Sequence, residues 1–362
     1  MRIGILTFHE IYNPGAYLQA YATMKLLEEM GHEAVIIDYT SPMHRFRPWR
    51  TLIQHPQVLV YFRNWVESFG RNHVFADCQR YLNKTSRLIT RTQVRLERFD
   101  AVLIGSDIVW NYQMTRLGQD PIYFGEDLNT DRLIAFAPSC GALDLSQPVP
   151  DFVQKGLHRF HAIAVRDRKT ADLVEMVIGR RPEIIADPTL VLNISELPEV
   201  HNYEDDYLLV YALPGAADPA TQNAIIDFAR KKYIKTVAVC YRQNWVDENH
   251  ICANPFEWLG RINNAKYIFT TTFHGTIFAL KAGKSFAVKY NALIDSKTRP
   301  LIELLSRQDR VWEGSTDLSV VLDASWDIVS TRQKMGFMAN RIIRYLEDAL
   351  AGRYDSEKIV PK

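Results

Sequence analysis

Apolar positions along the chain fall into short runs and into stretches with helical spacing, and the two kinds alternate. Residues 2–8, 101–105 and 162–165 have the length and β-branched content of buried strands. Residues 17–30 and 170–178 repeat their apolar positions with the period of a helix. Strands that alternate with helices predict an α/β fold with mostly parallel sheets and right-handed crossovers.

The same alternation starts again after an acidic, proline-containing stretch. At 362 residues the chain is longer than one typical core supports, so we expect two domains. These are an N-terminal domain (1–193) and a C-terminal domain (207–325), joined by a linker (194–206). A last helical pattern predicts a C-terminal helix (326–352), long enough to return to the first domain.

Residues 43–98 interrupt this rhythm, because they are rich in arginine with aromatic residues between the charges. One interpretation is a basic, aromatic insertion that meets an anionic acceptor or a membrane surface. The other is a helical subdomain whose aromatic side chains form a core and whose arginines are solvated. The aromatic residues are Phe46, Trp49, Tyr61, Phe62, Trp65, Phe69, Phe75 and Tyr81.

Composition narrows the class of protein. The net charge of +1 argues against nucleic-acid binding as the main role. The 4 cysteines form no Cys-x-x-Cys pair, which fits a reducing compartment and argues against a structural zinc site. We see no signal-peptide pattern and no apolar run long enough for a transmembrane helix, so we expect a cytoplasmic protein.

The segment with the clearest chemical content is residues 267–289. An apolar strand pattern (267–271) leads into His274 and Gly275, and a helix follows that Gly283 would end. In open α/β sheets, ligands bind at this edge, and a helix N-terminus favours anions. His274 is therefore a candidate general acid or ligand contact. The alternative is a histidine satisfied within a tight turn, with Gly275 present for close packing.

Arg166 directly follows the apolar run 162–165, so it lies at the corresponding edge of the first sheet. Its planar guanidinium can hold a carboxylate or a phosphate through two parallel hydrogen bonds. The alternative is a surface ion pair between Arg166 and Asp167.

Ser106, Asp107 and Trp110 follow the run 101–105. A carboxylate beside an aromatic ring is a common way to hold a sugar. The alternative is that Ser106 or Asp107 caps a helix while Trp110 packs in the core.

Two further groups of residues face the expected cleft between the domains. Asn13, Pro14 and Gly15 form a turn that opens a helix, although no dinucleotide or Walker motif is present. Basic residues after the strand at 285–290 could add positive charge: Lys284, Lys289, Lys297 and Arg299.

In their order and spacing, these segments resemble the polysaccharide pyruvyl transferase family. The resemblance covers most of the chain. The matching pieces are Asn13-Pro-Gly-Ala-Tyr-Leu-Gln, Phe99-Asp-Ala-Val-Leu-Ile-Gly-Ser-Asp-Ile-Val-Trp-Asn, Val165-Arg-Asp, Ala186-Asp-Pro-Thr-Leu-Val-Leu and Thr272-Phe-His-Gly-Thr.

The resemblance implies two Rossmann-like domains in a glycosyltransferase-B-like arrangement, with the active site between them. It also implies transfer of the pyruvyl group of phosphoenolpyruvate to two hydroxyls of a sugar or glycolipid, without a metal or cofactor. The donor-binding arginine then falls on Arg166, the essential histidine on His274, and a later basic residue on Lys297 or Arg299. Expected substrate contacts are Asn13, Gly15, Ser106, Asp107, Trp110, Gly275 and Thr276.

Two other functions remain open from the sequence. A sugar-nucleotide-dependent glycosyltransferase would need a carboxylate after the last strand to hold the ribose, for which Asp295 and Glu303 are the local candidates. A non-catalytic sugar-binding subunit would keep the fold without the activity.

The basic insertion would also fit contact of this cytoplasmic protein with the inner face of a membrane.

Overall fold

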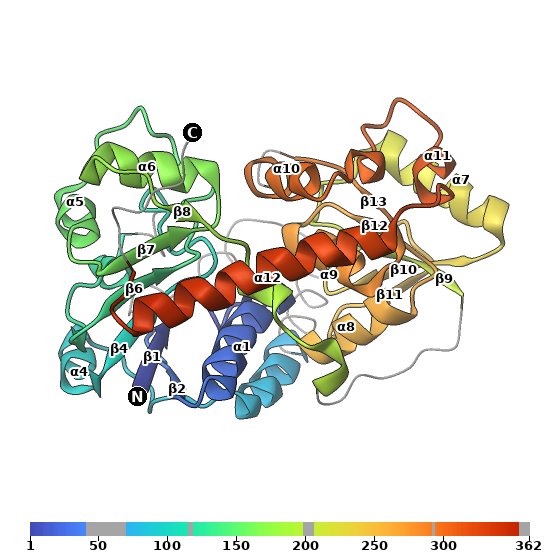
Figure 1. The fold of residues 1–362 in the computed structure, drawn as a ribbon. Helices are drawn as coiled ribbons and strands as arrows, with labels where there is room; N and C mark the ends of the chain where they lie inside the picture. The colour runs from blue at the N-terminus through green and yellow to red at the C-terminus, as the bar shows by residue number, and fades with distance from the viewer. Residues whose placement is uncertain (41–69, 115–118, 198–205, 292–293, 355–362) are drawn as a thin grey trace, which may run out of the picture.

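A computed structural model describes residues 1–40, 70–114, 119–197, 206–291 and 294–354. It contains two parallel sheets, each with its own helices, and the two lie side by side (Figure 1). The chain is thus an α/β protein with two Rossmann-like domains. The expectation for the first part of the insertion (43–69) lies outside the described residues.

The first sheet holds strands from the N-terminal half of the chain, all parallel, in the order β2-β1-β4-β6-β7-β8. Its central strands are buried on both faces, which explains their continuous apolar runs. The strands are β1 (Arg2–Leu6), β2 (Glu33–Ile36), β4 (Ala101–Ile104), β6 (Leu133–Phe136), β7 (Ala162–Val165) and β8 (Glu183–Ile184). A separate short pair joins β3 (Arg98–Phe99) to β5 (Asn129–Thr130).

The second sheet has the order β11-β10-β9-β12-β13 and is also parallel. Its strands are β9 (Tyr207–Tyr211), β10 (Lys235–Val239), β11 (Glu248–His250), β12 (Tyr267–Thr270) and β13 (Ser285–Val288). The sequence pattern did not predict β11, because its Glu-Asn-His sequence is polar and it pairs only at the edge of the sheet.

The helices follow the strands as crossovers. They are α1 (Pro14–Glu29), α4 (Arg91–Leu96), α5 (Asp151–Leu157), α6 (Arg168–Ile178), α7 (Pro219–Lys232), α8 (Pro255–Asn264), α9 (Phe273–Ala282), α10 (Asp295–Leu304), α11 (Ser319–Leu322) and α12 (Ile328–Leu350). Short 3-10 turns lie at η1 (Gln79–Tyr81), η2 (Pro121–Phe124), η3 (Pro188–Leu190), η4 (Ile194–Glu196) and η5 (Gln308–Arg310).

Two helices begin earlier than their apolar patterns predict. α1 starts at Pro14 because the Asn13 side chain accepts hydrogen bonds from the backbone N–H groups of Gly15 and Ala16. The apolar positions at 301–305 predict a short helix there, and α10 instead starts at Asp295, although Pro300 lies within it. The earlier start brings Lys297 and Arg299 onto a helix.

The described part of the insertion (70–98) supports the interpretation in which its aromatic side chains form a core. Phe75 is buried and its ring contacts Tyr12 and Tyr17. The ring of Tyr81 meets Phe256 of α8 edge-on, with ring centroids 5.2 Å apart. These aromatic side chains therefore help to join the two domains.

The C-terminal helix α12 lies across both domains (Figure 1). Near its end, the Tyr345 hydroxyl donates a 2.8 Å hydrogen bond to the Ala135 carbonyl of β6, and its ring stacks on Phe136. Arg341 forms an ion pair with Glu183 at the edge strand β8. Among the described residues, no helix is both long and apolar enough to cross a bilayer.

Lys281 is the main polar connection between α9 and the end of the first domain. Its ammonium donates to the backbone carbonyls of Thr189, Leu190 and Leu192 at 2.8, 2.7 and 2.8 Å. These carbonyls belong to η3 and the residues after it, where helical bonding ends. The contact positions α9, and therefore His274, against the first domain.

We expect Lys281→Met to lower the free energy of unfolding by about 2–3 kcal/mol, because buried carbonyls lose their donor. Urea unfolding measures this change. Lys25→Met is the matched control, since Lys25 forms a partly exposed ion pair with Glu28 and a 5.7 Å contact with the Tyr21 ring, and should change stability by about 1 kcal/mol or less. Equal stability of the two variants would show that the Lys281 contacts do not hold the domains together.

Candidate active site

The site lies where the strand order of each sheet reverses, beside β1 and β4 in the first domain and β9 and β12 in the second. Loops diverge at such points and leave a crevice at the carboxyl ends of the strands. In the first domain, the Gln19 amide ties the two strand ends together. It donates to the Thr7 hydroxyl at 2.9 Å and accepts from the Ser106 N–H at 3.1 Å.

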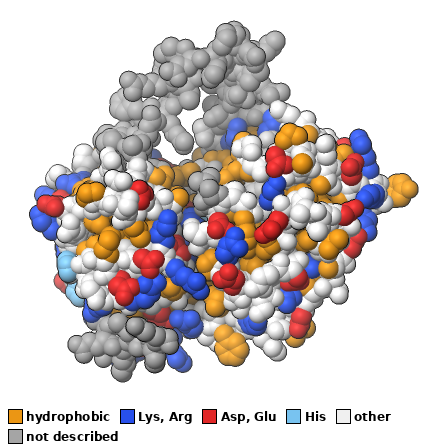
Figure 2. Space-filling model, turned by 90° about the horizontal axis from the view of Figure 1, so that it is seen from above, with side chains coloured by type: hydrophobic (Ala, Val, Ile, Leu, Met, Phe, Trp, Pro, Cys, Tyr) orange, Lys and Arg blue, Asp and Glu red, His pale blue; other side chains and the backbone are white. Residues whose placement is uncertain are grey.

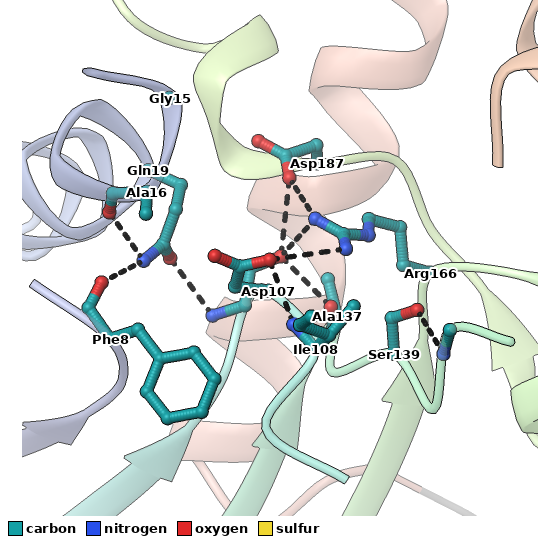
Figure 3. Close-up of polar contacts among 12 residues, drawn as sticks. Phe8, Gly15, Ala16, Gln19, Asp107, Ile108, Ala137, Ser139, Arg166 and Asp187 are labelled. Atoms are coloured by element: carbon teal, nitrogen blue, oxygen red, sulfur yellow. Dashed lines mark hydrogen bonds and ion pairs between the residues drawn. The ribbon is translucent and has the colours of Figure 1, made fainter. Parts of the chain in front are cut away.

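Arg166 follows β7 and is buried, with its guanidinium directed toward two aspartates (Figure 3). Nη1 donates to Asp187 Oδ2 at 2.6 Å, and Nη2 lies 3.7 Å from Asp107 Oδ1. The guanidinium also lies 5.0 Å from the centre of the Phe273 ring of the second domain. The alternative of a surface pair with Asp167 is wrong, because Asp167 instead caps α6.

Asp187 is a central residue that the sequence analysis did not select. It follows β8, and the available signal was its place in the Ala186-Asp-Pro segment, directly after a strand. Its Oδ1 accepts from the N–H and hydroxyl of Thr189, and Oδ2 accepts from Arg166 and from the Ser106 hydroxyl. Burial opposes ionisation, but His274, Arg166 and the Thr189 N–H outweigh it and hold the pKa of Asp187 well below its usual range.

His274 lies in the first turn of α9, which Thr272 caps. Its Nε2 is 3.6 Å from Asp187 Oδ2, so an imidazole of the second domain faces a carboxylate of the first. On its other side the ring touches Gly15, where a Cβ atom would come within 2.1 Å of Nδ1. The side chain is 9% exposed. The structure therefore places His274 between the start of α1 and Asp187.

A cavity of about 670 Å³ opens from Arg166 and Asp187 between the two domains. The α10 residue Lys297 lines it, and burial together with the Arg166 charge lowers the pKa of Lys297 to about 8. Its walls are largely apolar side chains of β8, α9, α10 and α12. The outer surface differs from the cavity: on the face seen in Figure 2, basic and acidic side chains are interspersed.

Several predicted substrate contacts are enclosed instead. Trp110 is 0% exposed; it stacks on Phe124 and donates its indole N–H to the Tyr123 carbonyl, so it packs in the core as the alternative held. Ser106 is 0% exposed, and its single O–H is shared between the Ala137 carbonyl at 2.9 Å and Asp187 Oδ2 at 3.2 Å. Neither side chain offers a surface to a sugar.

The remaining corrections concern the second domain and α1. Gly275 allows close packing, because a Cβ there would come within 2.3 Å of the Thr270 hydroxyl. Thr276 is buried and its hydroxyl donates to the Thr272 carbonyl. Arg299 lies on the exposed side of α10, paired with Asp295, and does not line the cavity. The Asn13 side chain is used as the cap of α1.

A second polar cluster lies after β1 and β2, where His9, Glu10 and Asp38 could together hold a metal ion. Lys84 and Arg87 already pair with these carboxylates. Because the two cations offset the two acidic charges, the cluster is less suited to a divalent cation than its ligand types suggest.

The family profile described as polysaccharide pyruvyl transferase matches residues 13–292, more than half of the chain. The chain belongs to this family. The match contains Arg166, Asp187 and His274, the residues that meet between the domains. Among curated proteins, no match was found.

Solved structures show the same fold at low identity. The UDP-GlcNAc 2-epimerase of Methanocaldococcus jannaschii has a TM-score of 0.52 and 11% identity, over 94% of this chain and 100% of that one. A putative UDP-N-acetylglucosamine 2-epimerase of Listeria monocytogenes has a TM-score of 0.50 and 14% identity, over 99% of both chains. Staphylococcus aureus MnaA, solved with UDP, has a TM-score of 0.50 and 12% identity, over 97% of both. The family member described here therefore has the two-domain, glycosyltransferase-B-like fold.

Gly15→Ala should displace His274, because a methyl group cannot fit where Nδ1 lies within 2.1 Å of the new Cβ. We expect kcat/KM in a transfer assay to fall at least about 100-fold, as a displacement of 1 Å in a catalytic group can cause. Gly336→Ala in α12 is the matched control, since nothing lies within 4 Å of its Cβ. That variant should keep its activity and gain up to about 1 kcal/mol of stability. Full activity of Gly15→Ala would contradict the packing described.

Proposed function

We propose that the protein transfers the pyruvyl group of phosphoenolpyruvate to two hydroxyls of one sugar unit, forming a pyruvate ketal and releasing phosphate. The observation that carries the proposal is the meeting of Arg166 and His274, from opposite domains, on the single carboxylate of Asp187. Family membership supports the same reaction class.

The charges around the cavity suit an anionic donor. Phosphoenolpyruvate carries close to three negative charges and needs cations rather than an apolar pocket. Among the described residues, Arg166 Nε is buried without a hydrogen-bond partner, and Lys297 lines the cavity with the charges of Asp107 and Asp167 acting on it. Arg168 and Arg180 also line the cavity. Arg166 is already paired with Asp187, so the additional positive charge of the cavity comes from Lys297, Arg168 and Arg180.

His274 is the group that we assign to proton transfer. Ketal formation requires a proton on the methylene carbon of the donor, which creates positive charge on the neighbouring carbon. An imidazolium can deliver that proton when it is correctly oriented. Asp187 faces Nε2 and stabilises the imidazolium, as a buried carboxylate does when it orients a catalytic histidine. Arg166 then stabilises the charge of the departing phosphate.

The acceptor in this proposal is a sugar of a polysaccharide or of its lipid- or nucleotide-linked precursor. The cavity combines apolar walls with charged groups, which suits a carbohydrate carried on a larger molecule. Neither ribose-binding candidate is well placed, because Asp295 is paired with Arg299. Glu303 lines the cavity but lies on α10 away from the strand ends.

The proposal is tested by incubating the protein with phosphoenolpyruvate and a panel of lipid- and nucleotide-linked sugars. We expect phosphate release together with an acceptor mass increase that matches a ketal-linked pyruvate. His274→Ala should lower kcat by about 10²- to 10⁴-fold because the proton donor is removed. His158→Ala, which changes an exposed histidine after α5, should have no effect.

Three other outcomes would contradict the proposal, and each can be told apart from the others. Release of a nucleoside diphosphate from a sugar nucleotide, without phosphoenolpyruvate, would indicate a glycosyltransferase. Sugar binding without turnover would indicate a non-catalytic subunit. Full pyruvyl transfer by His274→Ala would leave the reaction in place but remove the assigned proton donor.

The lowered pKa of Lys297 leads us to expect that donor binding depends on pH. Its pKa is lowered to about 8, so it is protonated below that pH and loses its charge above it. We expect the KM for phosphoenolpyruvate to rise about tenfold or more between pH 7 and pH 9.5, as one charge-assisted contact is lost. In Lys297→Met, KM should already be high at pH 7 and nearly independent of pH. A parallel rise in KM for wild type and variant would exclude Lys297 from donor binding.

A further inference from the structure

Ketal formation needs a group that removes a proton from the sugar hydroxyl, whereas His274 supplies only the acid that protonates the donor. Three aspartates surround Arg166: Asp107 after β4, Asp167 after β7 and Asp187 after β8. A carboxylate can act as a base only if one of its oxygens is free to accept from the substrate. The hydrogen bonds of the three side chains therefore decide between them.

Asp167 accepts hydrogen bonds from the protein on both oxygens. Its Oδ1 accepts from the N–H and the hydroxyl of Thr170, at 2.9 and 2.7 Å, and its Oδ2 accepts from the Ser139 hydroxyl at 2.6 Å. Asp187 is occupied in the same way, with Thr189 on one oxygen and Arg166 and Ser106 on the other. Both side chains are buried. Because both oxygens of each carboxylate already accept hydrogen bonds from the protein, neither is as available to a substrate proton as an oxygen without a partner.

Asp107 differs from both. Its Oδ1 accepts from the Ile108 N–H at 2.8 Å and faces Arg166, whereas Oδ2 has no hydrogen-bond partner among the described residues (Figure 3). Its side chain is 12% exposed, against 0% for Asp187. The backbone of Asp107 is held at a φ of +67°, a left-handed conformation that aims the side chain away from the regular strand direction.

The carboxylate of Asp107 lies close enough to the second domain for its charge to act there. The charge of Asp107 acts on Lys297 of α10 and on Tyr241, which follows β10. Asp107 therefore lies at the carboxyl end of the first sheet where the second domain faces it. Asp107 does not itself line the cavity of about 670 Å³, but Arg166, which it faces at 3.7 Å, and Lys297 both do.

We propose that Asp107 is the general base that accepts the proton of the attacking sugar hydroxyl, with Oδ2 as the accepting atom and Oδ1 held by the Ile108 N–H. This assignment rests on the proposed function, because it names a residue of that reaction. It gives Asp107 a catalytic role in place of a general substrate contact.

The proton balance is complete with this assignment. The O–H bond of the first hydroxyl breaks, its oxygen bonds to C2 of phosphoenolpyruvate, and the proton passes to Asp107. His274 protonates C3, and the bond between C2 and the phosphate oxygen then breaks. The second hydroxyl closes the ring and its proton leaves on inorganic phosphate. Asp107 returns its proton, through solvent, to His274, so one hydroxyl proton ends on the methyl group and the other on phosphate.

The test compares Asp107→Asn with wild type for phosphoenolpyruvate affinity by calorimetry and for kcat with an acceptor that wild type uses. Asparagine tolerates a positive φ, so the backbone should be kept. We expect kcat to fall about 10²- to 10⁴-fold while phosphoenolpyruvate affinity stays within about threefold or increases. Asp107→Gly, which also accepts this φ, should regain activity when formate is added as a substitute carboxylate. Asp131→Asn, at an exposed pair with Arg98, is the matched control and should be fully active.

Each other result overturns the assignment. An Asp107→Asn variant with more than about a third of wild-type kcat would show that no base is needed at this position. Loss of phosphoenolpyruvate affinity in proportion to kcat/KM, without formate rescue of Asp107→Gly, would show that Asp107 only positions Arg166. Wild type that binds phosphoenolpyruvate but forms no ketal would remove the proposed function, and the role of Asp107 with it. This last outcome is recognised in the wild type before any variant is compared.

Discussion

The buried carboxylate of Asp187 holds the candidate site together. It binds Arg166 of its own domain at 2.6 Å and faces His274 of the other domain at 3.6 Å. A buried carboxylate is stable as an anion only when positive charge and hydrogen bonds replace the water it has lost. Groups of both domains, Arg166 and the Thr189 N–H from the first and His274 from the second, therefore stabilise the ionised state of Asp187.

Other contacts hold the domains in the arrangement that this pairing needs. Lys281 anchors α9 to the three carbonyls at the end of the first domain, only two helical turns from His274. Gly15 leaves space for the imidazole where any side chain would collide with it. The long helix α12 lies across both domains and packs on β6 through Tyr345 (Figure 1). The two sheets thus form one site rather than two separate edges.

The aspartates near Arg166 show how one fold divides similar groups between structure and chemistry. Asp167 caps a helix, and Asp187 joins the domains. Asp107 keeps one oxygen for which the described part of the chain provides no hydrogen-bond partner. The residue type is the same in all three places, and the difference lies in the donors that each backbone position offers. The cations Arg166 and Lys297 both line the cavity between the domains.

Much of the fold was predictable from the sequence, because strand and helix periods are local. The runs at 101–105 and 162–165 became β4 and β7, and the pattern around 267–283 became β12 and α9. Less regular elements were missed or shortened, such as the polar edge strand β11 and the first turns of α10, because packing and capping decide them rather than an apolar period.

The sequence by itself placed Arg166 and His274 at the carboxyl ends of strands, since a residue that follows a strand must lie at that edge. Only the tertiary structure decided that they share Asp187, that Trp110 is enclosed in the core, and that Arg299 points to solvent while Lys297 lines the cavity. The physical reason is that hydrogen bonds, burial and charge pairing depend on distances between segments far apart in the chain, which no local period encodes.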